Sequence, residues 1–183
     1  MKEYVRAKAN SMKKINDLTL PGEIVIFGST YMANFPMYEL VNKCAFENAV
    51  YNRSIRGLTI GEALEIVEDC VIGIRPSKVF LSLGEEDEHD TDTIENYAAL
   101  VSKILSGLPN CELYIIGLTG NVPYTETFNK GLMGLCDGKG VKYVSFITKN
   151  ISETALYKAR FKQLSRFFRG RSMTMCDAFR AVE

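Results

Sequence analysis

Five short runs of apolar and β-branched residues recur along the chain. Each has the length of one strand, and uninterrupted runs of this kind are typical of strands that are buried on both faces of a sheet. The first follows the turn signal Pro-Gly. The runs are Glu23–Gly28, Ala49–Ser54, Lys78–Leu83, Glu112–Gly117 and Val141–Phe146.

Between these runs, apolar residues lie three or four positions apart, which predicts helices. Residues 1–20 are expected to hold an additional N-terminal helix, over 3–17, and residues 150–183 a helical C-terminal tail. Alternating strands and helices predict a parallel sheet with helices on both faces, a three-layer α/β/α sandwich. Ligands of such sheets bind at the carboxyl ends of the strands. The strongest periodic sets are Ile60, Ala63, Leu64, Val67 and Val71, and Ile94, Tyr97, Leu100, Val101, Ile104 and Leu105.

Length and composition narrow the class of protein. The 183 residues fit one domain, 1–183. Lys+Arg and Asp+Glu both number 22, so the chain has no general attraction to nucleic acid or anionic membranes, and neither is expected as a partner. The 5 cysteines show no paired spacing, which favours free thiols in a reducing compartment. With no signal-peptide pattern and no apolar stretch of membrane-spanning length, a cytoplasmic location is predicted.

Three loops that follow strand runs carry recognisable motifs. They are Gly28–Tyr31, Asn52–Ile60 and Pro76–Asp87. Together and in this order they resemble the SGNH (GDSL) hydrolases, a family of Ser-nucleophile esterases and lipases. The resemblance covers residues 20–148 best. It implies a five-stranded parallel sheet in the order 2-1-3-4-5, an arrangement of the flavodoxin-like type.

The resemblance assigns the family's catalytic positions one by one. The nucleophilic Ser falls on Thr30, and the Asp before it falls on Ser29. The oxyanion-hole Gly is retained as Gly57, whereas the oxyanion-hole Asn falls on Glu86. The distal Asp-x-x-His block aligns with residues 171–175, which places the catalytic His on Thr174.

These departures predict impaired or lost esterase activity. A hydroxyl nucleophile needs a base, usually His, and the extra methyl of Thr30 crowds its attack. Glu86, when ionised, only accepts hydrogen bonds, and losing one oxyanion donor costs roughly 3–4 kcal/mol of transition-state stabilisation. We expect Glu86 to be protonated, exposed to water, or paired with a nearby arginine, with Arg56 ahead of Arg53. The chain is then a binding or scaffolding module for a small molecule, as a monomer or a homodimer.

Four further residues are predicted to contact that small molecule: Ser29, Tyr31, Arg56 and His89, the single histidine. His89 belongs to an acidic run, residues 85–90. Such a run favours a solvated loop over the alternative, an acidic pocket entrance that binds a cationic group or a divalent metal. No metal-ligand spacing occurs, so neither a metal nor a cofactor is expected.

Two other functions remain open at this stage. The first is an active hydrolase with a non-standard site that uses Thr30. The second is a flavin-binding protein, because Ile26–Thr30 also looks like the phosphate loop of flavodoxins. The glycine expected after Thr30 in such loops is replaced by Tyr31.

Overall fold

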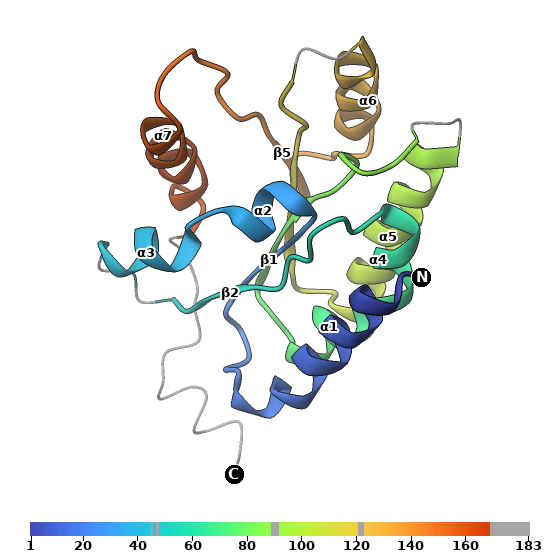
Figure 1. Cartoon of the computed structure of the whole chain (residues 1–183). Coiled ribbons are helices and arrows are strands. Elements are labelled where there is room, and N and C mark those ends of the chain that lie inside the picture. Colours follow the sequence, from blue (N-terminus) through green and yellow to red (C-terminus); the bar gives the residue numbers. More distant parts are fainter. Residues whose placement is uncertain (45, 47, 89–91, 121–122, 169–183) are drawn as a thin grey trace.

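A five-stranded parallel sheet forms the centre of the molecule. The computed structural model describes residues 1–44, 46, 48–88, 92–120 and 123–168. The strand order is β2-β1-β3-β4-β5, with every neighbouring pair parallel, which confirms the predicted sheet (Figure 1). The strands are β1 (Ile24–Gly28), β2 (Val50–Asn52), β3 (Lys78–Ser82), β4 (Glu112–Ile116) and β5 (Val141–Val144).

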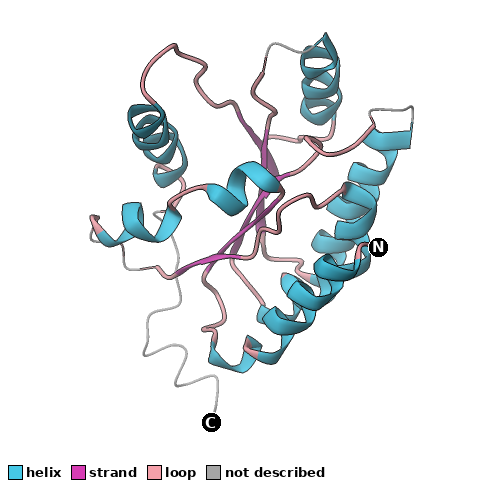
Figure 2. Cartoon of the chain, in the orientation of Figure 1, coloured by secondary structure: helices cyan, strands magenta, loops and turns pink. Residues whose placement is uncertain are grey.

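Helices cover both faces of this sheet (Figure 2). On one face the core is built with α1, α4, α5 and α6, and on the other with α2, α3 and α7. The helices are α1 (Glu3–Lys14), α2 (Thr30–Asn34), α3 (Met37–Asn42), α4 (Ile60–Cys70), α5 (Asp92–Gly107), α6 (Pro123–Gly134) and α7 (Glu153–Ser165). Short 3-10 turns follow α1 and α4, at Asn16–Leu18 and Ile72–Ile74.

The central strands explain the uninterrupted apolar runs. In β1, Val25 and Phe27 belong to the core beneath α1 and α4, whereas Ile24 and Ile26 belong to the core beneath α7. All four side chains are fully buried. Because successive residues of a strand point to opposite faces, a sheet that is covered on both sides needs apolar residues at every position.

The structure also refines the predicted elements. β2 and β5 are shorter than their apolar runs, and the predicted N-terminal helix ends at Lys14. Two helices after β1 were not predicted, because α2 and α3 have five and six residues, too few for a periodic pattern. In the C-terminal tail α7 is helical, and residues 169–183 lie outside the described part. No helix in the described part of the chain has the length and apolarity to cross a membrane.

Candidate functional site

Three loops at the carboxyl ends of β1, β2 and β3 meet through direct hydrogen bonds. Thr30 is the first residue of α2, directly after β1. The Gly57 backbone N–H donates to Thr30 Oγ1 at 2.8 Å. Thr30 Oγ1 in turn donates to Glu86 Oε1 at 2.5 Å. The structure thus brings together the three residues that align with the family's nucleophile and oxyanion hole.

The N-terminus of α1 holds the Gly57 loop from outside. Lys2 Nζ donates to the Gly57 carbonyl at 2.6 Å, and the Tyr4 hydroxyl donates to the Arg56 carbonyl. Gly57 itself has φ +67°, in the left-handed region that favours glycine, and a Cβ at this position would run into the Tyr4 hydroxyl. The glycine is therefore required by the loop conformation.

Two acidic side chains fix the start of α4 next to this loop. Thr59 and Glu62 form a reciprocal capping box at the helix N-terminus. Asp87, from the loop after β3, accepts the Ile60 N–H at 3.0 Å. Carboxylates at a helix N-terminus are stabilised by its unpaired N–H groups and its dipole. Asp87 therefore ties the loop that carries Glu86 to the loop that carries Gly57.

Glu85 occupies a more enclosed position than Glu86. Its Oε1 accepts the Tyr31 backbone N–H at 2.7 Å. Burial raises the pKa of Glu85 above its usual range, the Tyr31 N–H opposes the rise, and the neighbouring Glu86 charge adds to it. Glu85 and Tyr31 line a small cavity of about 110 Å³ together with Tyr124 and Phe146. The Arg160 guanidinium lies 5.0 Å from the centre of the Tyr31 ring on another side.

The hydrogen bonds around Thr30 engage the groups that align with the family's nucleophile and oxyanion hole. A nucleophilic hydroxyl needs a base that takes its proton, and N–H donors that are aimed at the substrate oxygen. Here the Gly57 N–H points at the Thr30 oxygen itself, so this donor is already engaged. The Glu86 carboxylate lies at the position that aligns with the family's second donor, and it accepts a hydrogen bond from the Thr30 hydroxyl. A carboxylate is an intrinsically weaker base than the imidazole that usually fills this role.

The other predicted site residues differ in how far they are exposed to solvent. Ser29 is fully buried, so its hydroxyl does not face solvent, and it has no hydrogen-bond partner among the described residues. Tyr31 is half-buried and Arg56 is exposed. His89 and Thr174 lie outside the described residues.

The ion pair expected between Glu86 and a neighbouring arginine is not formed. Among the described residues no basic side chain pairs with Glu86, which is exposed and bonded to Thr30 instead. The guanidinium of Arg53 turns away toward α1, where it donates to the Met12 carbonyl. Within the same described part, no cluster of three or more His, Cys, Asp or Glu residues is arranged to hold a metal ion.

Several residues of this region were missed at the sequence level. Lys2, Tyr4 and Glu62 support the Gly57 loop from segments far away in the sequence, and only the Thr-x-x-Glu spacing of the capping box was a visible signal. Asp87 was not predicted as a site residue either, although the family motif has an Asp at this position.

Comparison of the fold with solved structures identifies its type. A Streptococcus pneumonia protein, provisionally described as a platelet activating factor, superimposes with a TM-score of 0.78 at 17% identity, over 90% of this chain and 92% of that one. A GDSL-like lipase from Bacteroides thetaiotaomicron superimposes with a TM-score of 0.66 at 13% identity, over 87% of this chain and 98% of that one. For the psychrotrophic esterase EstA from Pseudoalteromonas sp., the TM-score is 0.64 at 17% identity, over 81% of this chain and 100% of that one. The chain has the SGNH hydrolase fold.

Of the comparisons with known proteins, the one with solved structures finds matches. No protein-family model matches the sequence, and no curated protein matches it. In this SGNH fold, the three loops that carry Thr30, Gly57 and Glu86 meet through hydrogen bonds, and their assignment to the family's nucleophile and oxyanion hole stays a prediction.

Proposed function

We propose that this protein is an SGNH-like binding or scaffolding module that has lost ordinary ester hydrolysis. One observation carries the proposal: the hydroxyl at the nucleophile position is held between the Gly57 N–H and the Glu86 carboxylate. In this arrangement the one retained oxyanion donor stabilises the resting hydroxyl instead of a developing negative charge. Removing a single such donor costs about 10²- to 10³-fold in turnover.

The test is hydrolysis of p-nitrophenyl acetate. We expect the protein to hydrolyse this ester no faster than Thr30→Val, which keeps the shape of the side chain and removes its hydroxyl. The triple variant Thr30→Ser, Glu86→Asn and Thr174→His restores the family's residue types and is expected to gain activity. Robust turnover by the unmodified protein that Thr30→Val abolishes would contradict the proposal.

A second candidate function uses the same contact. A nucleophile within hydrogen-bond distance of a base is the usual signature of covalent catalysis, and Thr30 with Glu86 has that geometry. A slow hydrolase with Glu86 as the base is expected to lose its turnover in Glu86→Gln. The binding module has no turnover to lose, so this variant separates the two functions.

A further inference from the structure

A large groove runs along the outer edge of β2, on the side of the Gly57 loop where Tyr4 and Arg56 lie. It has a volume of about 1040 Å³ and lies between α1 and the segment that contains α2 and α3. Its lining includes neither Thr30, Gly57 nor Glu86. We call it the β2-edge groove. Its size matches sites that take an organic ligand and exceeds what an inorganic ion needs.

A buried arginine lies at the groove. Arg53 is only 3% exposed, and its Nη1 donates to the Met12 carbonyl and to Asn16 Oδ1, both at 3.0 Å. Burial lowers the pKa of Arg53 below its usual value. Buried charges are normally paired with an opposite charge.

The surroundings of Arg53 supply only part of that opposite charge. The Met12 carbonyl belongs to the last turn of α1, whose partial negative charge is about half an elementary charge. Among the described residues no carboxylate pairs with Arg53, and its Nε and Nη2 have no protein acceptor. The Nε–H and the two Nη2–H groups of this planar fork therefore remain for a ligand.

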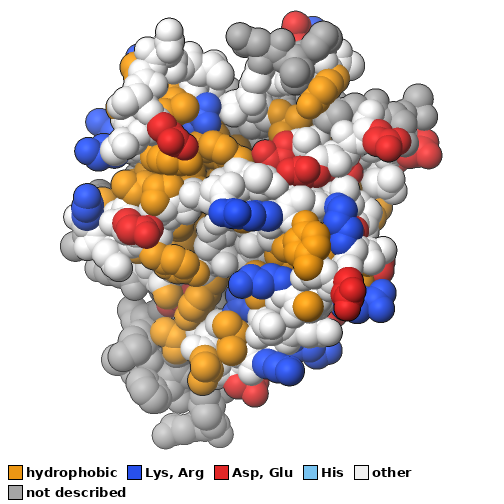
Figure 3. All heavy atoms as spheres, in the orientation of Figure 1, with side chains coloured by type: hydrophobic (Ala, Val, Ile, Leu, Met, Phe, Trp, Pro, Cys, Tyr) orange, Lys and Arg blue, Asp and Glu red, His pale blue; other side chains and the backbone are white. Residues whose placement is uncertain are grey.

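The charged side chains of described residues that line the groove are all basic. Lys8 and Arg56, both exposed, join Arg53, and no Asp or Glu of the described part of the chain lines the groove. Figure 3 shows Lys, Arg and hydrophobic side chains gathered over the face between α1 and α2. The charge of the groove is therefore complementary to an anion.

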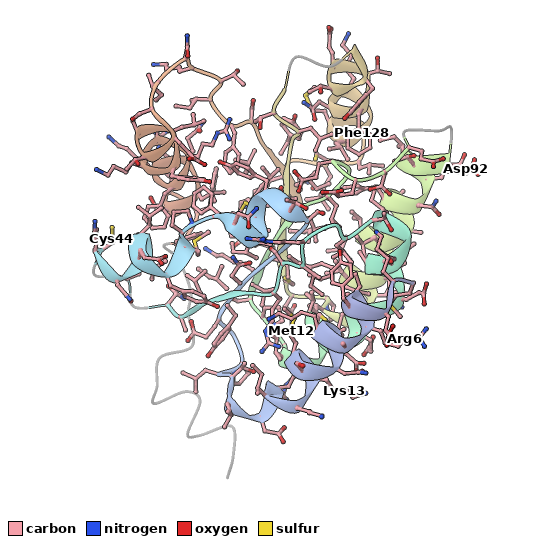
Figure 4. The ribbon with its side chains drawn as sticks, in the orientation of Figure 1. Arg6, Met12, Lys13, Cys44, Asp92 and Phe128 are labelled. Carbon is pink, nitrogen blue, oxygen red and sulfur yellow. The ribbon has the colours of Figure 1, made fainter. Side chains whose placement is uncertain are left out.

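Apolar side chains make up much of the rest of the lining, and its small polar residues are Ser11, Thr19, Asn52 and Ser54. Met12 points from α1 toward the sheet, whereas Arg6 and Lys13 point away (Figure 4). Ile15 and Leu18, farther along this edge, are 48% and 82% exposed. Contiguous exposed apolar residues beside a polar rim are typical of binding surfaces.

The groove also contains a buried hydroxyl group, that of Ser54. Ser54 lines it, is only 7% exposed, and its hydroxyl has no hydrogen-bond partner among the described residues. Buried hydroxyls are normally bonded, so this one is available to an acceptor.

We propose that the β2-edge groove binds an amphiphile with an oxyanion head, carboxylate or phosphate, and an aliphatic body. The head lies at Arg53 and Arg56, where a guanidinium pairs with two oxygens at once. The body lies against Met12, Ile15 and Ile55. The inference does not depend on the loss of ester hydrolysis, because none of the residues that line the groove is assigned to the nucleophile or the oxyanion hole.

The first experiment is titration calorimetry of the full chain with decanoate and with decyl phosphate, both below their micelle concentrations. The two probes distinguish a carboxylate from a phosphate head. Acetate, inorganic phosphate and 1-decanol supply either the head or the body alone. We expect at least one amphiphile to bind at least about tenfold more tightly than these partial ligands, which corresponds to about 1.4 kcal/mol. If neither amphiphile binds, or if 1-decanol binds equally well, the proposal is wrong.

Charge-reversal variants locate the site. Lys8→Glu and Arg56→Glu are expected to weaken binding at least about tenfold. Lys14→Glu is the matched control, because Lys14 is exposed on the same helix α1 and does not line the groove. It is expected to bind within about twofold of the unmodified protein. An equal loss in Lys14→Glu would show a general charge effect and overturn the assignment.

The oligomeric state in solution gives an independent outcome. If the groove is instead the interface of two copies, light scattering will show a dimer that Ile15→Glu dissociates, and no amphiphile will bind to the dimer. That result would also overturn the proposal.

Discussion

Gly84→Ala provides a sharp test of how the loop of Glu86 is held. Gly84 ends the buried β3 region directly before Glu85 and Glu86, with φ +110°, a conformation that is almost restricted to glycine. A Cβ at this position would lie 2.5 Å from Phe128 Cζ and closer still to Cε1. Phe128 is buried on α6, the helix where Figure 4 labels it, and its ring packs edge-on against Tyr97. Both rings are buried, so the Phe128 ring cannot move out into solvent without losing this packing.

The expected cost follows from two independent effects. Forcing a non-glycine residue into this conformation costs about 1–3 kcal/mol. Overpacking against a buried ring costs about 1–3 kcal/mol more. Gly84→Ala is therefore expected to lower the free energy of unfolding by about 2–6 kcal/mol, and the melting temperature by about 4–24 °C for a chain of this size.

The assay is urea unfolding followed by circular dichroism. Gly61→Ala is the matched control, because Gly61 lies on the exposed side of α4 and an added Cβ meets nothing within 4 Å. In this control the free energy of unfolding is expected to rise by about 0.5–1 kcal/mol. Phe128→Leu combined with Gly84→Ala should recover the overpacking part and leave the backbone part, which a double-mutant cycle measures. A free energy of unfolding of Gly84→Ala that lies within about 0.5 kcal/mol of that of the unmodified protein would refute the reasoning.

Two further predictions concern ionisable groups. Burial raises the pKa of Glu62, but bonds from Lys2 and the helix N-terminus outweigh this and hold it below its usual value. A depressed carboxyl pKa stabilises the fold at neutral pH, so Glu62→Gln is expected to cost about 1–2 kcal/mol there, measured by urea unfolding. That difference should close as the pH falls below about 4.3; a pH-independent difference would contradict this reading. Burial raises the pKa of Cys70 and of Cys111 to about 12, whereas Cys44 is exposed. A thiol reagent at pH 8 should label Cys44 in the native state and the two buried thiols only after unfolding, as peptide mass spectrometry will report; native labelling of Cys70 would contradict this.

The sequence by itself determined the layered architecture. Strands covered on both faces must be apolar at every position, so the five runs were visible without any knowledge of their partners. Helices such as α4 and α5 were visible because their buried faces repeat every three or four residues. The strand ends, and with them the positions of Thr30, Gly57 and Glu86, followed from the same pattern and from the motifs.

Only the tertiary structure decided which polar groups meet. Glu86 forms its hydrogen bond with Thr30 and not an ion pair with Arg56. Glu86 and Thr30 lie 56 positions apart in the sequence. Arg53 lies in the run Ala49–Ser54, which predicts burial, but the sequence does not show what its guanidinium contacts. In the structure it is buried against the end of α1, with no carboxylate paired to it among the described residues. Apolar burial repeats along the chain and can be read from it, whereas a hydrogen bond or a counter-charge depends on the position of one distant atom to within a few tenths of an ångström.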